Sequence, residues 1–145
     1  MYALSIRTTL DAAMDAVWKI ISDFGNPRFL PFEVLESSGS GPGATRRIRT
    51  PDGMRMVDRL EVLDRTSKTV QYSLDSAASD AGPMTSYRAT MRLHPAGDGG
   101  TDVEWSGQVE FAPEADPLSV LPMILTVYLA GLASMRSMLL QSGAP

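Results

Sequence analysis

One carboxylate, Asp58, interrupts a run of apolar side chains in the middle of the chain. The side chains alternate here, and one face carries Asp58 together with Met54, Met56, Leu60 and Val62. A carboxylate on an apolar face is costly unless it is paired, and burial raises its pKa. Asp58 is therefore a candidate general acid or base, or a hydrogen-bond partner for a ligand hydroxyl or carbonyl. The alternative is an ion pair with Arg46, which alternation with Ile48 turns inward from the preceding strand.

Two tyrosines, Tyr72 and Tyr87, fall on the apolar faces of later strands. A buried tyrosine hydroxyl needs a hydrogen-bond partner, so each can orient a ligand or donate a proton to a developing oxyanion. With Asp58 and Arg46 they form a candidate catalytic set. The alternative is that both are core tyrosines bonded to backbone or water.

Alternation of apolar and polar residues predicts an antiparallel sheet with one wet and one covered face. Strands are expected near residues 2–6 and over 32–38, 44–50, 54–64, 68–75, 85–93 and 102–111. In the strand after Pro83, the side chains from Thr85 and Tyr87 onward are expected to face inward. A first helix is expected from about Ala13 to Ile21, capped by Thr9 or Asp11, with one more turn at 28–31.

The last predicted element is an apolar helix, since the 19 residues from Pro117 to Met135 carry no charge. Asp116 and Pro117 read as its N-cap and first residue. A membrane span needs about 20 apolar residues. Pro122 inside the run would kink such a span, and several small or polar residues dilute it. Because the sheet needs a cover, we expect a core helix and no membrane span.

Composition excludes several classes of function. The net charge of -4 argues against nucleic-acid binding, and the absence of cysteine excludes thiolate chemistry and disulfides. The single histidine, His94, is expected to lie exposed in a turn, so we expect no metal site and no cofactor. We expect residues 1–145 to form one domain in the cytoplasm, since no signal segment is visible. A basic stripe is expected to be a solvated, acid-paired sheet face; it comprises Arg47, Arg49, Arg55 and Arg59.

Several stretches of the chain resemble the START-like, helix-grip superfamily, called SRPBCC, and more closely its polyketide cyclase/dehydrase branch. The resembling motifs are Val17-Trp-Lys-Ile-Ile-Ser-Asp-Phe-Gly-Asn26, Gly43-Ala-Thr-Arg-Arg47, Val57-Asp-Arg-Leu-Glu-Val-Leu-Asp64, Pro83–Tyr87 and Val103-Glu-Trp105. The resemblance implies an α+β fold in which a curved antiparallel sheet of about seven strands grips a long C-terminal helix. At Asp58 the family usually has Glu.

The resemblance also implies a pocket between the sheet and the helix. Its lining would be Ile48, Met56, Asp58, Tyr72, Leu74, Tyr87, Ala89 and Trp105, with Met123, Val127 and Gly131 from the helix. The expected partner is a small hydrophobic molecule that is cyclic, polyketide-like or lipid-like. The alternatives are a cyclase, aromatase or dehydratase, or a helix that serves association; a monomer and a homodimer both stay open. The loop 75–83 is small, polar and weakly anchored, and is expected to be a mobile lid over the pocket.

Overall fold

The computed structural model describes residues 1–142 and shows an α+β fold built on one antiparallel sheet. The elements, in chain order, are β1 (Tyr2–Leu10), α1 (Met14–Ile21), β2 (Glu33–Ser38), β3 (Thr45–Arg49), β4 (Arg55–Asp64), β5 (Thr69–Leu74), β6 (Met84–Pro95), β7 (Thr101–Phe111) and α2 (Leu121–Gln141). Short 3₁₀ turns occupy Ser76–Ala78, Gly97–Gly99 and Pro117–Ser119. The fold class expected from the sequence is confirmed.

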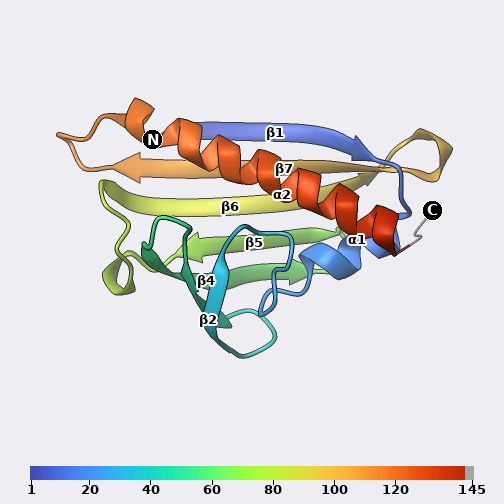
Figure 1. The fold of residues 1–145 in the computed structure, drawn as a ribbon, viewed down its shortest axis with the longest axis horizontal. Helices are drawn as coiled ribbons and strands as arrows, with labels where there is room; N and C mark the ends of the chain where they lie inside the picture. Colours follow the sequence, from blue (N-terminus) through green and yellow to red (C-terminus); the bar gives the residue numbers. More distant parts are fainter. Residues whose placement is uncertain (143–145) are drawn as a thin grey trace.

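The seven strands follow the order β1-β7-β6-β5-β4-β3-β2, and every neighbouring pair is antiparallel. Strands β2 to β7 are therefore consecutive neighbours, and β1 closes the far side of β7. Figure 1 shows α2 lying diagonally across one face of this sheet, with α1 close to its C-terminal end. We call the face toward α2 the inner face and the opposite face the outer face.

The helix α2 packs on the sheet through one stripe of its surface. Its buried residues are Tyr128, Gly131, Leu132, Met135 and Leu139, which recur at helical spacing. By length and composition alone α2 could also cross a membrane. In the structure this stripe lies against the sheet, as in the core helix of an α+β fold.

The start of α2 differs from the expectation. Asp116 accepts a hydrogen bond from the Leu118 amide, but it caps the 3₁₀ turn that precedes the helix. The helix itself begins at Leu121, so Pro122 lies in its first turn, where its missing N–H breaks no intrahelical bond. The kink expected at Pro122 is therefore wrong.

The start of α1 also differs. Strand β1 extends to Leu10, and the N-cap position of α1 is Ala13, which offers no side-chain cap. Thr9 instead donates to Asp102 on the neighbouring strand, so neither Thr9 nor Asp11 caps the helix. Residues 28–31 form turns and not a helical turn.

Two irregularities move side chains that simple alternation placed on the inner face. The register of β4 against β5 shifts between Leu60 and Val62, so Leu63 pairs with the buried Val70 and Val62 pairs with Gln71. A second shift, between Met84 and Ser86 in β6, leaves Thr85 exposed. An extra residue in one strand reverses the faces beyond it, so the inward placements of Val62 and Thr85 are wrong.

Gly131 allows α2 to lie close against the sheet. A Cβ atom at this position would lie 2.7 Å from Cζ3 of Trp105 on β7. We expect Gly131→Ala to lower the free energy of unfolding by about 1–3 kcal/mol through overpacking. Helix propensity alone would act in the opposite direction, by about 1 kcal/mol.

Urea denaturation followed by circular dichroism measures this effect. Gly41→Ala is the control, because a Cβ at Gly41 meets no atom within 4 Å. If the Gly131→Ala variant were as stable as the wild type, the packing of Trp105 on α2 would not require a glycine at position 131.

Candidate functional site

The antiparallel register collects the predicted polar residues on the inner face of the sheet. Asp58 pairs with Arg46 of β3 on one side and with Leu74 of β5 on the other. One step further along, Tyr72 pairs with Leu60 and with Ala89 of β6. The structure therefore brings together the four candidate catalytic residues that the sequence analysis named.

Arg46 and Asp58 form a buried ion pair. Nε of Arg46 lies 3.1 Å from Oδ2 of Asp58, and the two residues are only 3% and 5% exposed. The guanidinium also donates through Nη1 to the Phe24 carbonyl, and it contacts the Phe24 and Tyr72 rings at 4.2 and 4.8 Å from their centroids. Burial raises the pKa of Asp58, and the charge and hydrogen bond of Arg46 oppose part of that rise.

Two nitrogen donors in the interior of the described chain lack an acceptor. Among residues 1–142, Nη2 of Arg46 and Nε1 of Trp105 are buried side-chain nitrogens without a hydrogen-bond partner. A buried donor without a partner costs about 1–3 kcal/mol, and water or a ligand oxygen normally meets it. The arrangement therefore suits a ligand that carries acceptor oxygens.

Three tyrosines share this region and stay neutral near pH 7. The hydroxyls of Tyr87 and Tyr128 are 2.5 Å apart, and burial raises the pKa of both well above the usual value. Burial also raises the pKa of Tyr72 to about 12. A Cβ at Gly107 would lie 2.5 Å from the Tyr128 hydroxyl, so this glycine makes room for it. Neutral phenols of this kind donate hydrogen bonds but do not act as bases.

One half of the space under α2 is filled by aromatic packing. Trp105 stacks on Tyr128 with ring centroids 4.2 Å apart, and Phe29 meets the Trp105 ring edge-on at 5.8 Å. Gly131 faces Trp105 and not an open space. Gly131, expected to line the pocket, instead accommodates the Trp105 ring.

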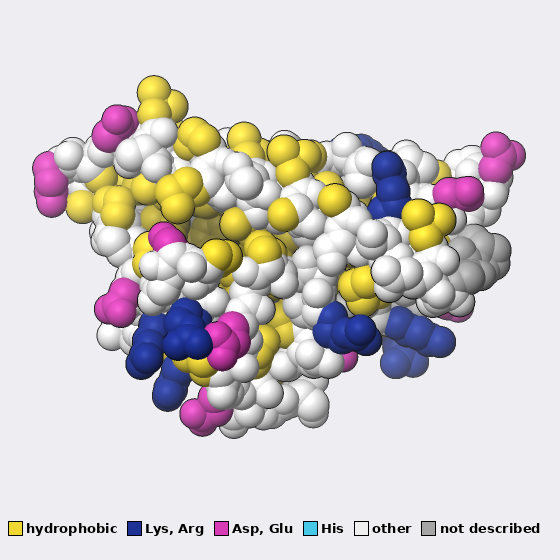
Figure 2. All heavy atoms as spheres, in the orientation of Figure 1, with side chains coloured by type: hydrophobic (Ala, Val, Ile, Leu, Met, Phe, Trp, Pro, Cys, Tyr) yellow, Lys and Arg dark blue, Asp and Glu magenta, His cyan; other side chains and the backbone are white. Residues whose placement is uncertain are grey.

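The other half is open. Along α2 no residue from Leu121 to Val127 is buried, although Ile124 and Val127 continue the inner stripe. Among the predicted pocket residues of the sheet, three are likewise only half-buried: Met56, Leu74 and Tyr87. Figure 2 shows hydrophobic side chains set back in a hollow beside the N-terminal half of α2. We call this hollow the recess.

The remaining pocket candidates lie as follows. Ile48, Ala89 and Trp105 are on the inner face but are almost completely buried, at 1% exposure or less. Met123 is 53% exposed, and Ile124 takes the position on the inner stripe that spacing by four had given to Met123.

Sequence reasoning did not name Phe24 or Tyr128 as site residues. Tyr128 could have been found, because it lies three residues before Gly131 on the same helical face.

The loop between β5 and β6 is more firmly tied to the sheet than expected. The Asp80 amide donates to the Arg55 carbonyl at 2.8 Å, and the Val57 amide donates to Oγ of Ser79 at 2.8 Å. The Asp75 amide donates to the Val57 carbonyl at 2.8 Å. The expectation of a weakly anchored loop is therefore wrong for Asp75–Asp80.

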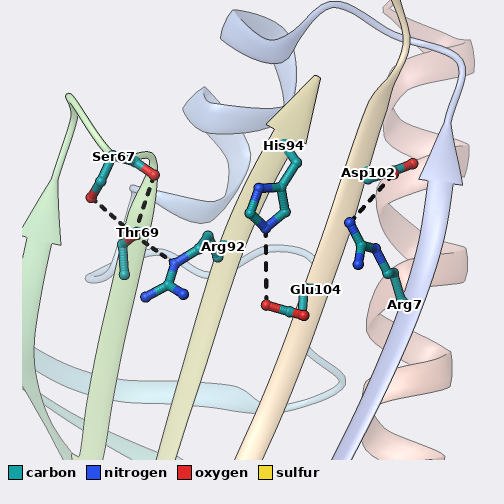
Figure 3. A network of polar contacts seen from close by, with 7 residues as sticks. All are labelled: Arg7, Ser67, Thr69, Arg92, His94, Asp102 and Glu104. Atoms are coloured by element: carbon teal, nitrogen blue, oxygen red, sulfur yellow. Dashed lines mark hydrogen bonds and ion pairs between the residues drawn. The ribbon is translucent and has the colours of Figure 1, made fainter. Parts of the chain in front are cut away.

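The outer face carries paired surface charges. Arg47, Arg49 and Arg59 of the basic stripe lie beside the carboxylates of Glu36, Glu33 and Asp75. Figure 3 shows polar contacts on β1, β6 and β7: Arg7 lies 3.6 Å from Asp102, and Nε2 of His94 lies 3.9 Å from Glu104. His94 thus belongs to strand β6 and not to a turn. No group of three metal-ligating side chains occurs within the described residues.

Comparison with solved structures gives the same fold. The protein XoxI from Bacillus cereus is 23% identical with a TM-score of 0.83 and full coverage of both chains. A protein from Nitrosospira multiformis is 25% identical with a TM-score of 0.75 and covers 94% of each chain. Ara h 8.0201 is 16% identical with a TM-score of 0.76, covering 97% of this chain and 98% of its own.

No curated protein matches the sequence. The family described as polyketide cyclase / dehydrase and lipid transport matches residues 1–137, which is nearly the whole chain. This match agrees with the helix-grip arrangement of α2 on the sheet, and it supports the binding of hydrophobic ligands in general. The chain belongs to the polyketide cyclase / dehydrase and lipid transport family.

Proposed function

We propose that the protein binds a small cyclic, polyketide-like or lipid-like molecule in the recess. The observation that carries this proposal is the change along α2. Its inner stripe is buried from Tyr128 to Leu139 but only half-buried at Ile124 and Val127. Ligand sites are usually lined by apolar side chains that face one another across an unfilled space.

The neighbouring chemistry indicates what such a ligand carries. The rings of Tyr72 and Tyr87 meet edge-to-face with centroids 6.5 Å apart, and Tyr87 is half-buried at the recess. Neutral tyrosine hydroxyls and the unpartnered Nη2 of Arg46 offer protons to an acceptor. A flat or cyclic molecule with carbonyl or hydroxyl oxygens would match both the apolar walls and these donors.

A second function, acid/base catalysis of cyclisation or dehydration, is favoured by one observation. Asp58 is a buried carboxyl group whose pKa is raised by burial, as is common in catalytic acids. Against it, Arg46 already occupies one oxygen of this carboxyl group. An ion pair of this kind can also stabilise the fold or orient a ligand, so it is no specific sign of catalysis. Binding therefore remains the first proposal.

Filling the recess tests the binding proposal. We expect Val127→Trp to weaken binding of the neutral probe N-phenyl-1-naphthylamine by about tenfold or more, since the indole occupies the space of the probe. Fluorescence titration measures the affinity. The matched control is Met123→Trp, which adds the same ring to an exposed position of the same helix. The proposal fails if both variants bind the probe as the wild type does.

The titration of Asp58 gives a second test. Its pKa in the folded state lies above the usual value of 3.8. As the pH rises above 3.8, the unfolded chain loses this proton first, so the Asp58 contribution to the free energy of unfolding falls until the folded carboxyl group also ionises. We expect the free energy of unfolding of Asp58→Asn to lack this fall with rising pH when urea denaturation is repeated from pH 4 to pH 7.

The same variant separates structure from catalysis. Asp58→Asn leaves the Arg46 charge without a counter-ion, which we expect to cost about 3 kcal/mol of stability. If the wild type gained stability relative to Asp58→Asn with rising pH, the Asp58 pKa would be lowered and not raised. Turnover of a poly-β-ketone substrate that survived Asp58→Asn would exclude Asp58 as the acid or base.

A further inference from the structure

A second hollow lies outside the recess, where β1 meets the C-terminal half of α2. It is a groove of about 320 Å³, and its apolar walls are formed by Ile6, Leu10, Leu129, Leu132 and Ala133. Its volume is at the lower end of those of small-molecule sites. The recess is bordered by β4, β5 and β6, whereas this groove adjoins β1 at the edge of the sheet.

The groove exists because α2 covers β1 incompletely. Strand β1 is the last strand of the sheet, and its inward-facing Ile6 and Thr8 are only half-buried. On the helix, Leu132 is 6% exposed, whereas Leu129 is 55% exposed. Apolar side chains from both elements therefore remain in contact with water along the same line.

The polar groups of the groove are donors. Arg136 forms no ion pair with any of residues 1–142, and Thr8 makes no side-chain hydrogen bond to them. Arg7 also borders the groove, but its guanidinium turns to the outer face and pairs with Asp102 (Figure 3). None of the described lining residues is an aspartate or a glutamate. The groove thus offers apolar walls with one positive charge that none of residues 1–142 pairs.

This charge decides which occupant fits. A second copy packed symmetrically on this groove would bring its own Arg136 to the same surface, and like charges disfavour such a contact. An anionic group beside Arg136 would instead gain a counter-ion. From Leu129 to Arg136 the helix rises by about 10 Å, which suits a chain of medium length.

We propose that this groove binds a single-chain anionic amphiphile, with its alkyl chain along Ile6, Leu129 and Leu132 and its carboxylate at Arg136. The site is separate from the recess and does not depend on the proposed function of the recess. It would give the protein a second binding site for fatty-acid-like molecules.

Titration with decanoate below its micelle concentration tests this proposal. In methyl NMR spectra we expect saturable shifts at Ile6, Leu10, Leu129 and Leu132. Decanol should bind more weakly, and decylammonium more weakly still, because Arg136 favours only the anion. Equal affinity for decanoate and decylammonium would overturn the role of the charge.

Two variants separate the charge from the groove. Arg136→Gln should weaken decanoate binding by about fivefold at low salt and leave decanol binding unchanged. The matched control is Arg65→Gln, an exposed arginine in the β4–β5 turn that removes the same charge elsewhere. Equal losses in both variants would show a general effect of net charge and would overturn the site.

Ala133→Phe fills the groove from an exposed helix position, so the fold should tolerate it. We expect this variant to lose the decanoate shifts and to keep the wild-type methyl signals of residues remote from the groove, such as Met56 and Leu74. Decanoate shifts confined to Met56, Leu74 and Val127 would overturn the groove site. Binding only to phosphatidylglycerol vesicles, without shifts by monomeric decanoate, would also overturn it and would indicate a membrane-contact surface.

Discussion

The contact between Trp105 and α2 sets how the helix lies on the sheet. Gly131 lets the indole approach the helix backbone, and Tyr128 stacks on the same ring. This contact fixes α2 on the sheet near the middle of the helix. Toward the C-terminus the stripe is buried down to Leu139, and toward the N-terminus it lifts from full contact. A closed half and an open half of the same interior follow from one packing contact.

The polar interior depends on the same geometry. Tyr128, which stacks on Trp105, also forms a hydrogen bond with the hydroxyl of Tyr87. The ring of Tyr87 in turn lies edge-on to the ring of Tyr72. Tyr72 in turn lies against the Arg46 guanidinium, which is held by Asp58. A continuous line of side chains therefore joins α2 to β3.

The sequence predicts most of the fold and the composition of the interior, because alternation reports which face of a strand is covered. Asp58, Arg46, Tyr72 and Trp105 were placed inward for this reason, and the structure places them there. Alternation fails after an inserted residue, so Val62 and Thr85 were assigned to the wrong face. A bulge depends on pairing between strands, which local composition does not encode.

The site was harder to predict than the fold. The residues of α2 are apolar on nearly every side, so spacing alone did not distinguish Met123 from Ile124 as the inner position. Gly131 read as space for a ligand, whereas Trp105, distant in the sequence, occupies that space. The Arg46–Asp58 pair could be stated from the sequence only as an alternative, because pairing depends on the register of β3 against β4.

We infer that the interior under α2 is filled in one half and able to take a ligand in the other. Intermolecular nuclear Overhauser effects between protein methyl groups and a bound neutral apolar ligand test it most directly. We expect contacts from the ligand to Met56, Leu74, Ile124 and Val127, and none to Met135 or Leu139. Contacts to Met135 and Leu139, with none to the first set, would contradict it.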